Sequence, residues 1–542
     1  MKNLRYMLIA ACSACLLLPL GSCMDTDMNR NKYEVDSEEI GRENYDLGST
    51  IRGLQGLVIP AQEHLYQFME AMCGGSYAGY FGETRTGWLE KYSTYNPKTD
   101  WLKAPFTDVI SETYPKYYAV LQHEDAPVAL ALAKLLRVTI MQRVTDIYGP
   151  IPYSKVLVSG EGSESDGLNA AYDSQKDVYM RMFQELEEAD QALEDNMTEG
   201  NSGFEKLDDV YYGKLQQWRL FLHSLQLRMA MRLCYTDMAT EAQSIAEKAV
   251  AAGVIEKNDD NALFHVAENR SALCFNDWKD YRIGADIICY MNGYADPRRD
   301  KYFTKVKNND QEGYYGMRIG INSPFSDDDM ITSYSNRLMT ASDPYVWMTA
   351  SEVAFLRAEG ALRKWNMGGE AKDFYETGVK LSFEEHGASG AEDYLNSIAS
   401  PSGYTDPLGS YSTGSPANIT VKWNEMGEQA FEENLERIIT QKWIALFPNG
   451  IESWSEHRRT GYPKLLPVVV NKGRNVSTEA GMRRLMYPNE EYTQNSFHLN
   501  NAINVLIKES SNNQGGDTGG THVWWDLSLI HISEPTRHSL IS

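Results

Sequence analysis

The sequence predicts a mostly α-helical protein in which pairs of helices are joined by long irregular loops. Several stretches place apolar residues three and four positions apart, which is the spacing of one face of an α-helix. The stretches between them are long and rich in Gly, Ser, Asn, Asp and Tyr, as loops are. The helical stretches are neighbours along the chain, so we expect tetratricopeptide-like helix pairs, although no clean 34-residue repeat is present.

The first of these helices begins near Val128, where Leu132, Leu136 and Val144 lie on one apolar stripe. It should end before the segment 148–152, where a glycine and two prolines cannot continue a helix. Apolar spacing or an N-terminal capping box predicts further helices from Asp173 to about Leu193, Gln216 to Leu233, Thr349 to Trp365, Glu370 to Glu385 and Glu432 to Phe447.

Two of these helices carry features that bear on packing. In the helix from Thr349, the small residues Ala354, Ala358 and Ala361 form a strip on which a neighbouring helix can pack closely. In the helix from Gln216, we expect the arginines to extend from the flanks of the apolar face toward water: Arg219, Arg228 and Arg232.

Four stretches are predicted to be irregular: 75–101, 264–345, 397–421 and 510–521. Loops of such length are usually functional or disordered. The first two are rich in aromatic residues, which argues against disorder.

The N-terminus is predicted to be a secretion signal, residues 1–22. Lys2 and Arg5 precede an apolar stretch, 7–20, that is too short for a permanent membrane helix. Leu-Gly-Ser before Cys23 looks like a bacterial lipobox, so Cys23 is expected to become the lipidated first residue of the mature chain. An ordinary signal peptide with a chance cysteine is the alternative. No later segment is long and apolar enough to span a bilayer, so acyl chains would form the anchor to the membrane.

Residues 23–44 are polar and acidic and are predicted to be a solvated tether. Acidic residues soon after a lipidated cysteine also resemble an export signal to the outer leaflet, and a plain linker is the alternative. At the other end, 527–542 begins with LSLIHISEPTR, which looks like a translated sequencing or cloning adapter rather than a native tail. Residues 45–526 remain, and they fit one large helical domain or two domains.

The charge and the cysteines exclude several classes of partner. A net charge of -24 disfavours nucleic acid, whose binding depends on basic patches. Of the seven cysteines, four remain after the signal and Cys23 are set aside, and they lack zinc-ligand spacing. We expect buried thiols or at most one disulfide among Cys73, Cys234, Cys274 and Cys289. The run 327–329 could hold Ca²⁺ but is better interpreted as a solvated acidic turn, so no metal and no cofactor are assigned.

A series of motifs carries a resemblance to a known family. Read in order, the segments resemble the SusD/RagB family of nutrient-binding outer-membrane lipoproteins, in its SusD-like second branch, over residues 45–526. The family pattern expects alanine where this chain has Gly360, a change of about 1 kcal/mol in helix propensity. The motifs are TDIYGPIPY at 145–153, SLQLRMAMR at 224–232, DPR at 296–298, the helix at 348–365, ITQKW at 439–443, RRTGYP at 458–463 and YPNE at 487–490.

The charged residues of these motifs are interpreted as scaffold. Arg228, Arg298 and Arg458 are expected to hold loops through carboxylates or carbonyls rather than to touch ligand. Asp296 before Pro297 suits a helix N-cap. The resemblance implies binding of glycans, and in some branches of peptides, on loops that vary between members.

Candidate ligand contacts therefore come from the aromatic-rich loops. Sugars present apolar ring faces edged with hydroxyls, so a site for them needs exposed aromatic planes beside polar groups. We expect one or two of Trp88, Tyr92, Tyr95 and Trp278 to face ligand. Alternatively, any of these side chains packs inside a loop, as tyrosine and tryptophan often do.

The resemblance also implies a partner and a mechanism. The partner is a TonB-dependent SusC-like outer-membrane barrel, which the lipoprotein covers like a lid at the cell surface, capturing a nutrient and releasing it by a hinge motion. The sequence has no HExxH, GxSxG or Walker motif, so no catalytic residues are predicted. A surface glycan- or peptide-degrading hydrolase is the alternative function, and a purely structural surface protein is a third.

Overall fold

The computed structural model describes residues 45–156, 169–197, 205–425 and 430–527. The predicted signal peptide, the tether with Cys23 and residues 528–542 lie outside these ranges. The chain divides into two units at Asp46, and nearly all described residues belong to the second.

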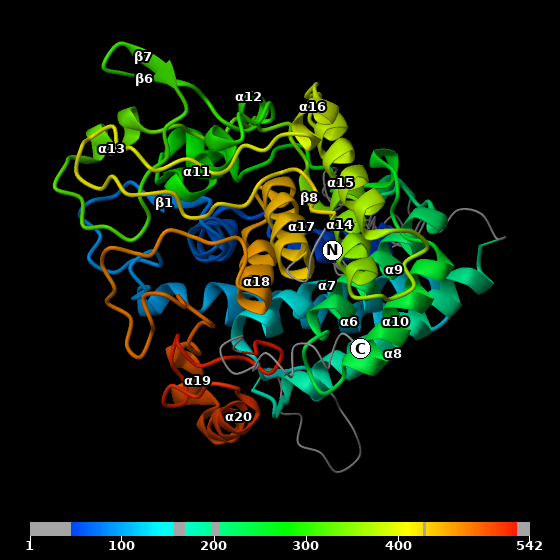
Figure 1. Ribbon diagram of the computed structural model, residues 1–542. Coiled ribbons are helices and arrows are strands. Elements are labelled where there is room, and N and C mark those ends of the chain that lie inside the picture. The colour runs from blue at the N-terminus through cyan, green and yellow to red at the C-terminus, as the bar shows by residue number, and fades with distance from the viewer. Residues whose placement is uncertain (1–44, 157–168, 198–204, 426–429, 528–542) are drawn as a thin grey trace, which may run out of the picture. The chain divides into compact units, whose positions relative to one another are not determined.

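The described chain is mostly helical, as predicted, with four short antiparallel strand pairs (Figure 1). The strand pairs are β1 (Phe81–Glu83) with β5 (Tyr281–Ile283), β2 (Ile151–Pro152) with β3 (Tyr172–Asp173), β4 (Ala262–Phe264) with β8 (Tyr345–Met348), and β6 (Val306–Asn308) with β7 (Gln311–Gly313). The longer helices are α3 (Tyr45–Val58), α6 (Val109–Leu121), α7 (Pro127–Tyr148), α8 (Gln175–Asp195), α9 (Leu215–Arg232), α10 (Ala239–Ala252), α11 (Ala285–Gly293), α14 (Ala350–Leu362), α15 (Ala371–Glu385), α17 (Ala430–Leu446), α18 (Gly450–Thr460) and α20 (Ser496–Glu509). The shorter helices are α4 (Glu63–Tyr66), α5 (Gly75–Tyr77), α12 (Arg299–Tyr302), α13 (Asp327–Ser333), α16 (Ala391–Leu395) and α19 (Asn489–Gln494), and the π and 3-10 segments are η2 (Gln67–Gly74), η3 (Thr99–Trp101), η4 (Ala104–Asp108), η5 (Glu205–Leu207), η6 (Asn258–Asp260) and η7 (Leu273–Asp277).

Consecutive helices pack as pairs: α7 on α8, α9 on α10 and α14 on α15, while α14 also packs on α9 and α17. Local chemistry fixes their ends. α7 ends because Gly149 has φ 88°, a conformation that favours glycine. α8 begins after Ser174, whose side chain accepts a hydrogen bond from Asp177 N. Likewise, the Thr349 side chain accepts from Glu352 N at the start of α14.

The packing of α14 explains the departure at Gly360. A Cβ at this position would lie 2.6 Å from Met367 Sδ, so glycine leaves room for the buried Met367 side chain. α14 continues unbroken through Gly360. On the side toward α15, Gly378 similarly admits the Phe355 ring, 2.8 Å from where its Cβ would be. Close packing of α14 therefore uses glycines as well as the predicted alanines.

The two aromatic-rich stretches predicted to be irregular contain more regular structure than expected. Residues 75–101 include α5 and β1, and residues 264–345 include β5 and α11–α13. α11 was missed because its residues 285–291 are all buried, so no polar face alternates with an apolar one.

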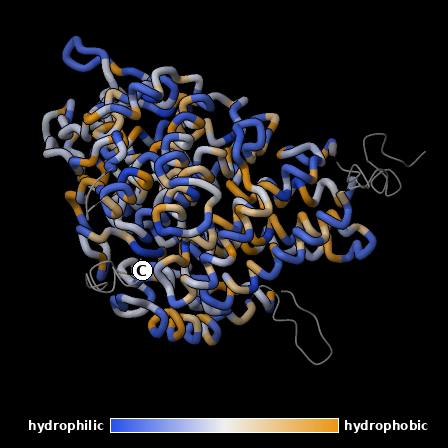
Figure 2. The backbone as a smooth tube through the Cα atoms, turned by 45° about the vertical axis from the view of Figure 1, so that its right-hand side comes forward, coloured by the Kyte–Doolittle hydropathy of each residue, from blue (hydrophilic) through white to orange (hydrophobic). Residues whose placement is uncertain are grey.

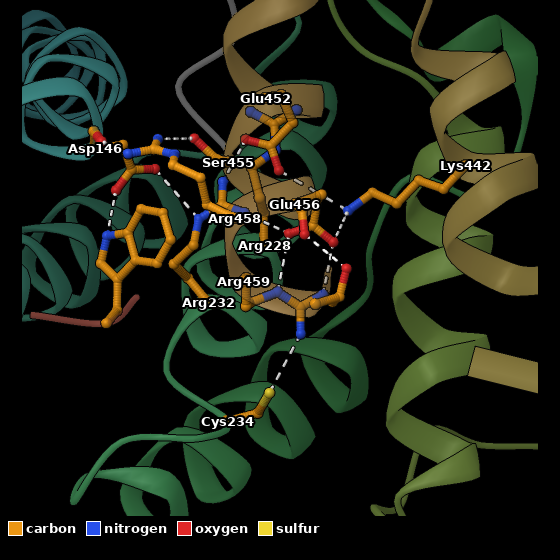
Figure 3. Close-up of polar contacts among 12 residues, drawn as sticks. Asp146, Arg228, Arg232, Cys234, Lys442, Glu452, Ser455, Glu456, Arg458 and Arg459 are labelled. Carbon is orange, nitrogen blue, oxygen red and sulfur yellow. Dashed lines mark hydrogen bonds and ion pairs between the residues drawn. The ribbon is translucent and has the colours of Figure 1, made fainter. Parts of the chain in front are cut away.

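A network of buried ion pairs joins α7, α9, α14, α17 and α18, and Figure 3 shows its side chains pointing toward one another from these helices. Arg228 donates to both carboxylate oxygens of Glu352, each over 2.7 Å, and to the Trp347 carbonyl. Arg232 donates to Glu452 over 2.6 Å. The prediction that Arg228 and Arg232 extend to water is therefore wrong: they are 2% and 0% exposed because buried carboxylates face them.

The other scaffold predictions have mixed outcomes. Arg458 donates to the carbonyls of Asp146 and Arg483, as expected of a loop-holding residue. Arg298 donates to the Asp296 carboxylate over 2.6 Å. However, Asp296 is not the N-cap, because α12 begins at Arg299; its carboxylate accepts instead from Arg298 N.

All four cysteines that remain in the described chain are buried free thiols. Among the described residues, no helix has both the length and the hydropathy that a bilayer span requires. Figure 2 shows hydrophilic and hydrophobic residues interleaved along this part of the chain.

Candidate ligand-binding site

The β1–β5 ladder brings together the two loops predicted to carry ligand-binding aromatics. In its antiparallel register, Glu83 lies opposite Tyr281. Trp88 follows β1 and Trp278 precedes β5, so both leave the ladder at the same end.

Arg85 ties these loops together. Its Nε donates to Asp280 Oδ1 over 2.7 Å, and its guanidinium also donates to the Trp278 carbonyl. Gln67 Nε2 donates to the other Asp280 oxygen over 2.8 Å. Burial raises the pKa of Asp280, and the hydrogen bond from Arg85 opposes that shift. The backbone that carries Trp278 is thus held against the loop that carries Trp88.

Five aromatic side chains form what we call the aromatic strip: Trp278, His64, Phe68, Trp101 and Trp88. Trp278 stacks on His64 with ring centroids 5.0 Å apart, and Trp101 stacks on Phe68 at 5.5 Å. Trp88 meets Trp101 edge to face at 5.4 Å. His64 on α4 and Phe68 at the start of η2 lie about one helical turn apart and connect the two ends.

The aromatic strip is open to solvent and is bordered by polar groups. His64 is exposed, and its four other members are half-buried. Asn276, Asp277, Lys279 and Glu90 are exposed next to the strip residues in the chain. Aromatic planes beside amide and charged groups can bind the apolar faces of sugar rings and hydrogen-bond their hydroxyls.

Trp88 and Trp278 thus share one surface, but Tyr92 does not belong to it. Tyr92 is fully buried, which makes it wrong as a ligand contact. Its ring stacks on Trp101 at 6.1 Å and packs against Tyr77 at 6.0 Å, because the loop folds back onto the core at this point.

Tyr95 is half-buried, has φ 64° and lies on a separate cavity of about 230 Å³. Tyr77, Trp454 and Asp286 also line this cavity. Burial raises the pKa of Asp286 to about 6. The structure therefore separates Tyr95 from the aromatic strip.

Sequence reasoning missed His64 and Phe68. They lie on a helical segment, where aromatic residues ordinarily indicate core, and their neighbours Leu65 and Tyr66 are indeed buried. The available signal was their spacing of four residues, which places two aromatic rings on one face.

The acidic run at 327–329 starts a helix rather than forming a turn. Ser326 and Asp329 make a capping box at the start of α13. Asp327 accepts hydrogen bonds from the backbone and the hydroxyl of Thr86, over 2.8 and 2.6 Å. Within the described ranges, no group of His, Cys, Asp or Glu is arranged to hold a metal ion.

Comparison with known proteins places this architecture. The profile of the SusD-like family, described as Susd and RagB outer membrane lipoprotein, matches residues 27–526. The chain belongs to the SusD-like family. A SusD homologue from Bacteroides thetaiotaomicron VPI-5482 is 97% identical, with a TM-score of 0.86 over 90% of this chain and 100% of that one. No match is found among curated proteins.

More distant SusD-like structures keep the same fold. A SusD homologue from Bacteroides ovatus ATCC 8483 is 43% identical, with a TM-score of 0.83 over 89% of this chain and 99% of that one. A chitin-binding SusD homologue from Flavobacterium johnsoniae is 34% identical, with a TM-score of 0.81 over the same shares. The family is one of outer-membrane lipoproteins, and the resemblance predicted from the motifs is confirmed.

Proposed function

We propose that this SusD-like protein binds a glycan at the cell surface through the aromatic strip and delivers it to a TonB-dependent SusC-like outer-membrane barrel. The observation that carries the proposal is the convergence of Trp88 and Trp278 on one solvent-accessible aromatic surface. A relative at 34% identity that is described as chitin-binding supports a glycan ligand.

Binding requires no covalent step in this proposal. The rings of the strip cover apolar sugar faces, while Arg85 and Asp280 keep the two loops together. Release then needs only a change in the relation between the protein and its barrel, such as a hinge motion.

The test is a glycan array followed by titration calorimetry, with chito-oligosaccharides as the first probe. The double variant W88A/W278A should weaken binding of the best glycan by about a hundredfold, since base or sugar stacking on one aromatic ring is worth about 1–3 kcal/mol. The matched control is Phe497→Ala, which removes a 72% exposed aromatic on α20, outside the strip. Unchanged affinity in W88A/W278A would reject the strip as the site, and the absence of any bound glycan would reject the function.

A surface hydrolase is the second candidate class, and one assay separates it. Purified protein incubated with the bound glycan should release no new reducing ends. Steady release proportional to protein concentration would replace the binding function with hydrolysis.

The anchor and the partner have their own tests. Cys23 should carry the acyl chains, so Cys23→Ser should abolish metabolic labelling by a palmitate analogue and free the protein from the outer membrane. Protease added to intact cells should cleave the anchored protein if it faces outward. Affinity capture from solubilised outer membranes should recover a TonB-dependent barrel, and capture of the tagged protein alone would count against the partnership.

A further inference from the structure

A second cavity, of about 380 Å³, lies where β8, the end of α15 and the turn between α17 and α18 meet. Its volume is within the range of small-molecule sites. No residue of the aromatic strip lines it. Apolar side chains form part of its wall, including Leu338, Val346, Phe447 and Pro448.

Three polar atoms on the residues of this wall have no hydrogen-bond partner among the described residues: Trp347 Nε1, Glu385 Oε2 and His386 Nε2. Trp347 is only 2% exposed. Glu385 Oε2 and His386 Nε2 are 4.0 Å apart, which is too far for a hydrogen bond between them. Because buried polar groups are nearly always hydrogen-bonded, these three indicate a polar occupant.

The charges around the cavity do not favour an ionic occupant of either sign. Lys301 and Arg337 line it together with Asp343 and Glu352. Burial lowers the pKa of His386 to about 4, so its imidazole is neutral at pH 7. A neutral imidazole and a carboxyl group can both take part in hydrogen bonds with hydroxyls.

The wall also offers a flat, fixed surface. The Tyr302 ring stacks on Phe447 with centroids 5.2 Å apart and meets His386 edge to face at 4.7 Å. Both Tyr302 and Phe447 are buried, so packing from behind fixes their positions.

From this arrangement we infer that the cavity is a second binding site, which accepts a neutral polyhydroxylated ring about the size of one pyranose. Ring hydroxyls both donate and accept, so neighbouring hydroxyls can satisfy the Trp347 indole N–H, the Glu385 carboxyl and His386 together. Phe447 and Leu338 then cover the apolar faces of the ring. This inference does not depend on binding at the aromatic strip.

The probes are D-glucose, D-galactose and N-acetyl-D-glucosamine, each titrated into the protein and followed by ligand-observed NMR. Two variants test the cavity. Trp347→Phe removes the indole N–H, and Leu338→Trp narrows the cavity from a position that is 51% exposed, without altering any buried group. At least one probe should bind the wild type, and each variant should weaken it by about tenfold, the value of one hydrogen bond or more.

W88A/W278A is the matched control and should bind the monosaccharide as the wild type does, even where it has lost the longer glycan. The inference is overturned if none of the three probes binds, or if W88A/W278A abolishes binding while Leu338→Trp leaves it unchanged. A crystal soaked in the best probe that shows only water in the cavity would also overturn it.

Discussion

Arg85 Nε donates to Asp280 Oδ1 over 2.7 Å and thereby joins two loops that are nearly two hundred residues apart in the chain. Trp88 lies three residues after Arg85, and Trp278 two residues before Asp280. The distance between the two tryptophans is therefore set by one partly exposed ion pair and by the short ladder behind it.

Replacing Arg85 should separate the loops without unfolding the protein. Arg85→Ala leaves Asp280 with Gln67 alone, so we expect a loss of about 1–2 kcal/mol in the free energy of unfolding. Glycan affinity should fall by about tenfold because the two ends of the strip are no longer fixed. Calorimetric titration with the best glycan measures the affinity, and urea unfolding measures the stability. Arg85→Ala with full affinity would show that the pair does not position the strip.

The buried ion pairs should matter far more to stability. Arg459 is fully buried and donates to Glu359 over 2.7 and 2.6 Å and to Glu456 over 2.6 Å. Although burial alone would raise it, the pKa of Glu456 is held well below its ordinary value by Arg459, Lys442 and Arg232. Arg459→Met leaves these carboxylates buried without that partner and should cost about 3–5 kcal/mol in urea unfolding.

The control for Arg459 is Lys248→Met, which breaks an ion pair whose side chains are 75% and 74% exposed. Such a pair contributes roughly 0–1 kcal/mol. Equal costs for the two variants would mean that burial does not strengthen the dependence on the pair.

This buried network also explains which helices the sequence predicts. α7 is recognisable because its core face is a stripe of Leu, Ile and Val. α18 escapes the same test because Glu452, Glu456, Arg458 and Arg459 point into the protein, a pattern that in sequence is typical of a solvated helix. Hydrophobic periodicity identifies a helix only where the buried face is apolar.

The candidate site is predictable to a similar degree. The density of aromatics and glycines identifies the loops of Trp88 and Trp278. It does not separate Trp88 from Tyr92, because only the folded path of the loop buries one ring and exposes the other. The contribution of His64 and Phe68 depends on which face of α4 and η2 packs on the core, a tertiary property that spacing alone leaves open.

Gly360 offers a test of packing against helix propensity. Gly360→Ala should gain up to about 1 kcal/mol from propensity. The new Cβ would lie 2.6 Å from Met367 Sδ, and overpacking of this kind costs about 1–3 kcal/mol. We expect net destabilisation by about 1 kcal/mol in urea unfolding. In a Met367→Ala background the same change should become stabilising, and destabilisation in both backgrounds would contradict the steric explanation.

Glu385 and His386 should give opposing pH dependences of stability. Burial raises the pKa of Glu385 to about 7 from 4.5, so the folded protein holds this proton more tightly than the unfolded chain. Stability from Glu385 is therefore complete below pH 4.5 and is lost as the pH rises toward 7. For His386 the folded pKa is about 4 against 6.5, so the unfolded chain binds the proton more tightly and stability rises between pH 4 and 6.5.

Because the two effects overlap, the difference between the wild type and Glu385→Gln isolates the carboxyl group. The free energy of unfolding of the wild type, relative to Glu385→Gln, should fall by about 2–3 kcal/mol between pH 4.5 and pH 8, since one pKa unit corresponds to 1.36 kcal/mol. Urea unfolding of both proteins at half-unit pH steps measures this difference. A constant difference across the range would show that Glu385 titrates in the folded protein as it does in the unfolded chain, and that burial at the cavity does not disfavour its charge.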